Sequence, residues 1–131
     1  MGNMTSAKPD YPTIFGKLRG ILLEHASRFT VAADRADYYC LEVPCSPKFK
    51  KGFPIAWVKV SKSYVSFHFM PVYFAPELKK DLSAELKARM QGKSCFNFRA
   101  VDEKLFGELH RLTANGFAAL KKIGAVGAHL T

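Results

Sequence analysis

The sequence predicts a two-layer α+β domain, in which helices cover one face of a largely antiparallel sheet of about five strands. Three observations lead to this prediction: helical apolar periodicity near both ends of the chain, strand-like alternation between them, and an apolar and a mixed face on most of the strands. The expected element order is α-β-β-β-β-α-β-α. A chain of 131 residues suits a single domain, placed at residues 10–123 between flexible termini at 1–9 and 124–131.

The first helix is expected from Asp10 onward. Asp10 is a suitable N-cap, and Pro12 falls in the first turn, where proline is tolerated. Apolar residues then recur at steps of three, four and seven: Ile14, Leu18, Ile21, Leu22 and Phe29. This spacing predicts an amphipathic helix that covers another layer.

Four strands are expected next, at residues 29–33, 38–43, 55–61 and 64–70. The aspartates at 34 and 37 suit a turn between the first two strands, and residues 46–52 form a basic surface loop.

The last two of these strands have a predicted register. If residues 62 and 63 form the hairpin loop, Val60 lies opposite Val65, 58 opposite 67, and 56 opposite 69. One face is then entirely apolar. A three-residue loop would mix apolar and polar residues on both faces, and so the sequence favours the two-residue loop.

The second half of the chain is expected to contain a helical region from Pro76 to Gln91, with Ser83 as an internal N-cap and Gly92 as the helix stop. Residues 94–99 then alternate as a strand. Asp102 is expected to cap a final helix with a broad apolar stripe, formed by Leu105, Phe106, Leu109, Leu112, Phe117 and Leu120.

The tripeptide Gly92-Lys93-Ser94 does not predict a phosphate-binding loop. Such a loop needs a glycine five positions before Gly92, where Lys87 stands, and it precedes a helix. No spacing of cysteine and histidine fits a structural metal site, and no arrangement predicts a nucleophile with its base. We therefore expect no cofactor, no metal and no catalytic residues, and we favour a non-enzymatic protein over an enzyme.

Composition limits the partners. The formal net charge is +9 and the isoelectric point about 9.6, which favours anionic ligands, acidic proteins or nucleic acid. Three cysteines form no even disulfide framework, and no apolar stretch reaches the roughly 20 residues of a membrane span. We expect a cytoplasmic protein without membrane contact, either a monomer or a homodimer.

The mixed face of the sheet is the predicted binding surface. Its candidate residues are Trp57, Lys59, Tyr64, His68, Lys93, Asn97 and Arg99, with Tyr38 and Lys62 beside them. The cations would supply charge, the aromatic rings planar contact, and His68 and Asn97 hydrogen bonds. The predicted function is a binding domain for an anionic small ligand or an acidic protein partner, and a nucleic-acid-binding module is an alternative.

Two segments, residues 64–71 and 90–98, resemble the YdhG-like family of small bacterial proteins of unknown function. The similarity extends over about residues 13–120. It implies a frataxin-like architecture and, from one branch of that family, iron-chaperone activity as a further alternative. Such iron binding depends on an acidic ridge, for which the first helix and following hairpin offer Asp10, Glu24, Asp34, Asp37 and Glu42.

Overall fold

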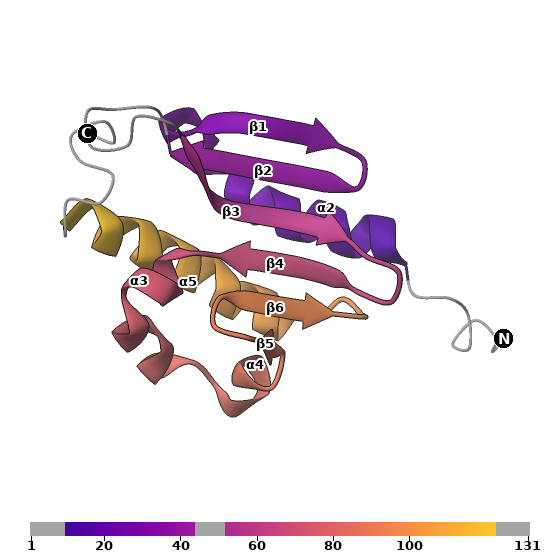
Figure 1. Ribbon diagram of the computed structural model, residues 1–131. Helices are drawn as coiled ribbons and strands as arrows, with labels where there is room; N and C mark the ends of the chain where they lie inside the picture. The colour runs from indigo at the N-terminus through magenta and orange to yellow at the C-terminus, as the bar shows by residue number, and fades with distance from the viewer. Residues whose placement is uncertain (1–9, 44–51, 123–131) are drawn as a thin grey trace, which may run out of the picture.

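The computed structural model describes residues 10–43 and 52–122. The predictions of flexible termini and most of the predicted basic loop lie outside these residues. Within them the chain forms a six-stranded antiparallel sheet in the order β1-β2-β3-β4-β6-β5, with two long helices behind one face (Figure 1). The predicted α+β fold class is confirmed, with six strands rather than about five.

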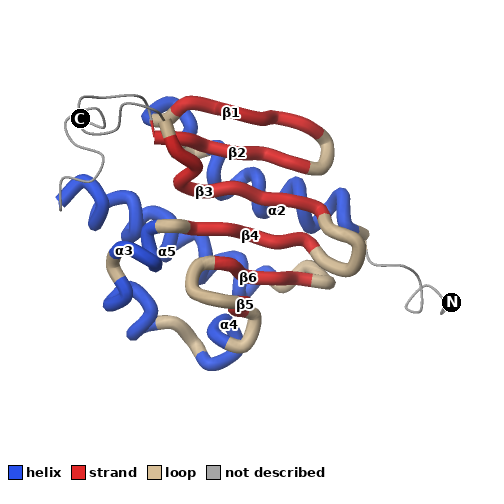
Figure 2. The backbone as a smooth tube through the Cα atoms, in the orientation of Figure 1, coloured by secondary structure: helices blue, strands red, loops and turns tan. Residues whose placement is uncertain are grey.

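The strands are β1 (Thr30–Arg35), β2 (Tyr38–Val43), β3 (Phe53–Val60), β4 (Val65–Phe69), β5 (Met90–Gln91) and β6 (Cys95–Phe98). The helices are α2 (Tyr11–Leu23), α3 (Pro71–Phe74), α4 (Ala84–Lys87) and α5 (Glu103–Lys122), with 3-10 turns η1 (Ala26–Arg28) and η2 (Pro76–Asp81). Figure 2 shows α3 at the end of β4, close to α5, and α4 beside β5 at the edge of the sheet.

Both long helices begin at the aspartates predicted to cap them. The Thr13 amide donates to Asp10 Oδ1 at 3.1 Å, and the Leu105 amide donates to Asp102 Oδ1 at 3.1 Å. Each cap satisfies an amide that has no partner inside its helix. The apolar stripes of α2 and α5 therefore start at fixed positions, and both stripes are buried against the sheet.

The register of β3 with β4 is the predicted one. Val60 pairs with Val65, Val58 with Phe67, and Ala56 with Phe69, while the Ser61 amide donates to the Tyr64 carbonyl at 2.8 Å across the loop. Because side chains alternate along a strand, this register places every apolar partner on the helix side. The resulting core is continuous across the sheet, and its largest fully buried side chains are Tyr39, Phe67, Phe69, Phe96, Phe98 and Phe117.

The predicted helical region from Pro76 to Gln91 is wrong in its continuity and in its last residues. The chain makes only η2 and α4, and Met90 and Gln91 then pair with β6 as an edge strand. Ser83 is the N-cap of α4 as predicted, but its amide also donates to Glu108 Oε2 of α5 at 3.0 Å. This contact to α5 ties the segment to the helix layer and separates η2 from α4.

Gly92 is therefore not a helix stop but the turn residue of the β5–β6 hairpin. Its φ is +77°, a conformation that glycine adopts without the steric cost of a Cβ. The turn returns the chain at once, so Met90 faces Phe96 and packs against the core. A helix-ending glycine and a hairpin glycine look alike in sequence, because both require the same φ.

Replacing Gly116 of α5 with alanine is expected to destabilise the fold. A Cβ at this position would collide with the Phe69 ring and lie 3.0 Å from Pro71 Cβ, so α5 would have to move from the sheet. Overpacking of this kind costs about 1–3 kcal/mol, and we expect that loss in the free energy of unfolding measured by urea denaturation.

Gly107 of the same helix is the matched control, because a Cβ there meets no atom within 4 Å. Gly107→Ala should stabilise the protein by up to about 1 kcal/mol through helix propensity. Equal effects of the two substitutions would show that α5 does not pack closely at Gly116.

Candidate functional site

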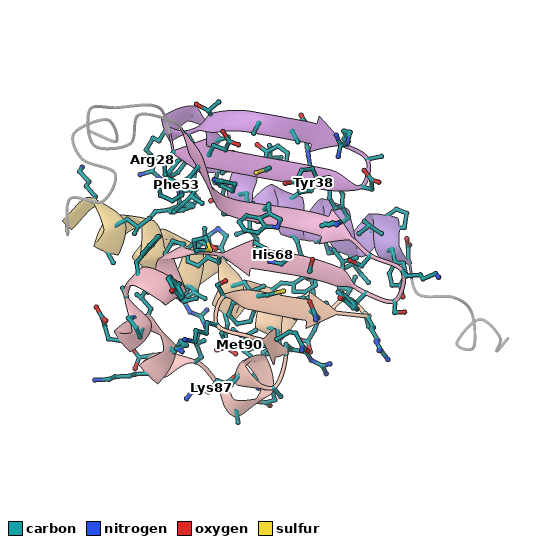
Figure 3. All side chains as sticks on the ribbon, in the orientation of Figure 1. Arg28, Tyr38, Phe53, His68, Lys87 and Met90 are labelled. Carbon is teal, nitrogen blue, oxygen red and sulfur yellow. The ribbon has the colours of Figure 1, made fainter. Side chains whose placement is uncertain are left out.

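The candidate site lies on the sheet face turned away from α2 and α5. This surface, which we call the mixed face, includes the following residues of β2, β3, β4 and β6: Tyr38, Cys40, Glu42, Trp57, Lys59, Ser66, His68, Cys95 and Asn97. Figure 3 shows Tyr38 and His68 on the side of the sheet opposite the long helices. Among the described residues, no helix covers this face (Figure 1).

Trp57 and His68 form the centre of the mixed face. They are cross-strand partners, and their rings are stacked with centroids 4.6 Å apart and planes at 10°. That spacing is close to the roughly 4.7–4.9 Å between neighbouring strands, so the rings stand side by side across the sheet. The imidazole thus occupies one flat side of the indole, which reduces the planar surface that Trp57 offers to a ligand.

A hydrogen-bonded cluster continues from His68 toward β6. His68 Nε2 lies 3.0 Å from Ser66 Oγ and 3.7 Å from Cys95 Sγ. The Cys95 thiol donates to Asn97 Oδ1 at 3.3 Å, and the Ser66 hydroxyl donates to the Lys59 carbonyl at 3.4 Å. Neighbouring residues of three strands are therefore held together by polar contacts.

The charge states of this cluster follow from its surroundings. Burial, together with the positive charge of Lys59, lowers the pKa of His68 to about 4, and burial raises the pKa of Cys95 to about 11. Both groups are neutral at pH 7. A catalytic cysteine acts as a thiolate, usually beside a protonated histidine, so this pair is not an activated nucleophile.

A pocket of about 290 Å³ opens where the mixed face meets the β5 edge. We call it the edge pocket; it is lined by Tyr64, Ala88, Arg89, Met90, Gln91, Asn97 and Arg99. Two guanidinium groups, two amides and a phenol line it, and none of its lining residues is a carboxylate. Planar guanidinium groups bind carboxylates and phosphates through paired hydrogen bonds, so this lining suits an anion.

A second pocket, of about 310 Å³, has the opposite character. It lies between η2 and α5, where Glu77, Asp81 and Glu108 line it together with Arg111. Three carboxylates against one guanidinium would repel an anion at pH 7. Similar volume with opposite charge makes the edge pocket the stronger candidate for an anionic ligand.

The structure brings only some of the predicted residues together. Tyr64, Asn97 and Arg99 line the edge pocket. Trp57, Lys59 and His68 lie beside it on the two central strands of the mixed face. Lys93 lies elsewhere, with its Nζ 6.0 Å from the centroid of the Tyr73 ring in α3. Lys62 is exposed in the β3–β4 loop.

Sequence reasoning missed Arg89 and Gln91, because both fell inside the predicted helix. The available signal was the apolar pair Met90 and Phe96 on either side of Gly92, which is typical of a short hairpin. The backbone amide of Asn97 donates to the backbone carbonyl of Arg89 at 2.9 Å, and this bond places the arginine beside the mixed face.

Three of the five carboxylates that an acidic ridge could use are engaged with separate partners. Asp10 caps α2, Glu24 contacts His110 Nε2 at 2.9 Å, and Asp34 pairs with Arg19 at 2.9 Å. Within residues 10–43 and 52–122, no three His, Cys, Asp or Glu side chains gather to hold a metal ion. The described part of the chain thus offers iron no cluster of oxygen ligands.

Comparison with known proteins leaves the lineage open. Neither family models, nor curated proteins, nor solved structures gave a match to this chain. The resemblance to the YdhG-like family stays a prediction. Over the described ranges, no helix is both long and apolar enough to cross a membrane.

The depressed pKa of His68 is directly measurable. An NMR titration should find His68 neutral until the pH approaches about 4. Lys59→Ala should raise this pKa, because it removes a nearby positive charge, but not to the ordinary value of about 6.5, because burial remains. Lys93→Ala should leave it unchanged, and a wild-type pKa near 6.5 would contradict the described burial.

The same shift makes stability depend on pH. Between about pH 6.5 and 4 the unfolded chain binds a proton at His68 that the folded chain does not. Stability therefore falls as the pH falls through this window. Allowing for partial exposure of the ring, His68→Gln should remove about 1–2 kcal/mol of the pH-dependent loss, measured by denaturation at pH 7 and pH 4.5. An unchanged pH dependence in this variant would contradict the prediction.

Proposed function

We propose that this protein is a non-enzymatic binding domain whose edge pocket holds a small organic anion, with a carboxylate or phosphate group between Arg89 and Arg99. The observation that supports this most strongly is the lining of the pocket, which contains two guanidinium groups and no carboxylate. The volume of about 290 Å³ is at the small end of ligand sites and suits a compact metabolite.

The remaining lining residues supply directional contacts. Asn97 and Gln91 carry amides that donate and accept, and Tyr64 offers a hydroxyl and a ring face. The net charge of +9 attracts anions to the whole molecule, and Lys59 lies on the same cross-strand row as Asn97. Selectivity would come from the pocket, and the long-range charge would raise the association rate.

A small ligand fits this geometry better than an acidic protein. Concave sites of this size surround a compact molecule, whereas stable protein interfaces bury about 800 Å² on each partner. We also propose that the protein acts in the cytoplasm, where its unpaired Cys40 and Cys95 thiols would stay reduced.

Thermal-shift measurements test the proposal. The panel is inorganic phosphate, a dicarboxylate and a nucleoside monophosphate, each at constant ionic strength. A ligand at ten times its dissociation constant should stabilise the protein by about 1.4 kcal/mol, which raises the melting temperature by a few degrees. Arg89→Ala and Arg99→Ala should each remove most of this increase.

Lys93→Ala is the matched control, because it removes one positive charge outside the edge pocket. It should retain the stabilisation. If all three variants lose the effect equally, the anions act on net charge alone and the proposed pocket is wrong; the same holds if no anion stabilises the wild-type protein.

Single-stranded nucleic acid is the second candidate, and one observation favours it. Arg35, Tyr38, Lys59, Ser66 and Asn97 form one cross-strand row, with the Arg35 guanidinium 5.2 Å from the Tyr38 ring centroid. This row could follow a phosphate backbone. Oligonucleotide affinity should then fall steeply with salt and weaken in Arg35→Ala, measured by fluorescence anisotropy; no binding at 50 mM salt would exclude it.

A further inference from the structure

The Cys95 thiol and the His68 imidazole approach each other on the mixed face without needing one another as hydrogen-bond partners. The thiol has a shorter contact to Asn97 Oδ1, at 3.3 Å, and His68 Nε2 has a shorter contact to Ser66 Oγ, at 3.0 Å. The Sγ–Nε2 separation is 3.7 Å. Sulfur and imidazole nitrogen are both strong ligands for transition metals.

We infer that Cys95 and His68 form a two-ligand site for Cu(I). With a metal–sulfur distance of about 2.3 Å and a metal–nitrogen distance of about 2.0 Å, one ion can bridge two atoms no more than about 4.3 Å apart. The observed 3.7 Å fits within this limit and corresponds to an angle of roughly 115–120° at the ion. The two atoms can be bridged without movement of the backbone.

The ligand types select the metal. A thiolate and an imidazole are soft and borderline ligands that suit Cu(I), whereas hard cations require oxygen clusters. Zinc sites use three or four protein ligands, and in the described ranges no third His, Cys, Asp or Glu joins this pair. Cu(I) takes two ligands in a near-linear arrangement or three in a trigonal one, and an angle of roughly 115–120° makes this pair two of three ligands, with a solvent molecule as the third.

The site is held in position and can be reached from solvent. Stacking on Trp57 fixes the plane of the imidazole, and pairing of β4 with β6 places His68 directly opposite Cys95. Both side chains are only partly buried. Pre-orientation by neighbouring residues is the usual way in which proteins hold metal ligands.

Binding releases one proton for each ion. The imidazole binds through the lone pair of Nε2, with its hydrogen on Nδ1, and the thiol binds through sulfur once it has lost its hydrogen. Cu(I) replaces the thiol hydrogen, a sulfur–copper bond forms, and the proton goes to solvent. The oxidation state of copper does not change.

The test is competition for Cu(I) against the chelator bicinchoninate, with ascorbate present. Every protein carries Cys45→Ser, because Cys45 lies outside the described residues. The reference protein, which carries Cys45→Ser alone, should take up one Cu(I). Cys95→Ser and His68→Asn should each weaken Cu(I) binding by more than about tenfold. The control is Cys40→Ser, which removes a buried thiol on the same face and should bind Cu(I) as the reference protein does.

A second readout does not depend on how the variants fold. The chain has one tryptophan, and Trp57 is stacked on the proposed ligand His68. Adding one equivalent of Cu(I) to the reference protein should change its tryptophan fluorescence. Equal Cu(I) affinity in the Cys95→Ser protein, binding that His68→Asn leaves intact, or unchanged fluorescence would each overturn the inference. Because Arg89 and Arg99 are not involved, anion binding and copper binding can fail separately.

Discussion

The pairing of β3 with β4 determines which side chains of this protein meet its helices and which meet solvent. Shifting this pairing by one residue would move Val58 and Phe67 out of the core and turn Lys59 and Ser66 toward α2 and α5. The flanking strands inherit the same alternation. One register therefore creates the apolar surface that α2 and α5 cover and, on the other side, the row of polar groups that leads to the edge pocket.

This register was predictable because the sequence segregates apolar and polar residues so cleanly between residues 56 and 69. The caps Asp10, Ser83 and Asp102 were predictable for a related reason, since each is a local interaction between neighbouring residues. The β5–β6 hairpin was not, because a two-residue strand carries no periodicity. Its position depends on pairing with β6 and on the tie between Ser83 and Glu108, which are contacts that the sequence order does not reveal.

That missed hairpin also explains which part of the candidate site could be predicted. Alternation places Asn97 on the polar side of β6, and Tyr64 and Arg99, which stand next to the ends of β4 and β6, line the same pocket. Arg89 and Gln91 enter the edge pocket only because the chain reverses at Gly92. The same reversal carries Lys93 away to Tyr73, although it is adjacent in sequence. Stacking of Trp57 on His68 likewise depends on cross-strand pairing and changes what the indole can offer a ligand.

The central claim is that anions bind at the edge pocket rather than over the basic surface as a whole. Chemical-shift mapping with inorganic phosphate at constant ionic strength tests it most directly. We expect saturable shifts of backbone amides at residues 88–91 and 97–99, with little change at Lys79, Lys80 and Lys121. Shifts that spread evenly over the lysines and do not saturate would contradict it.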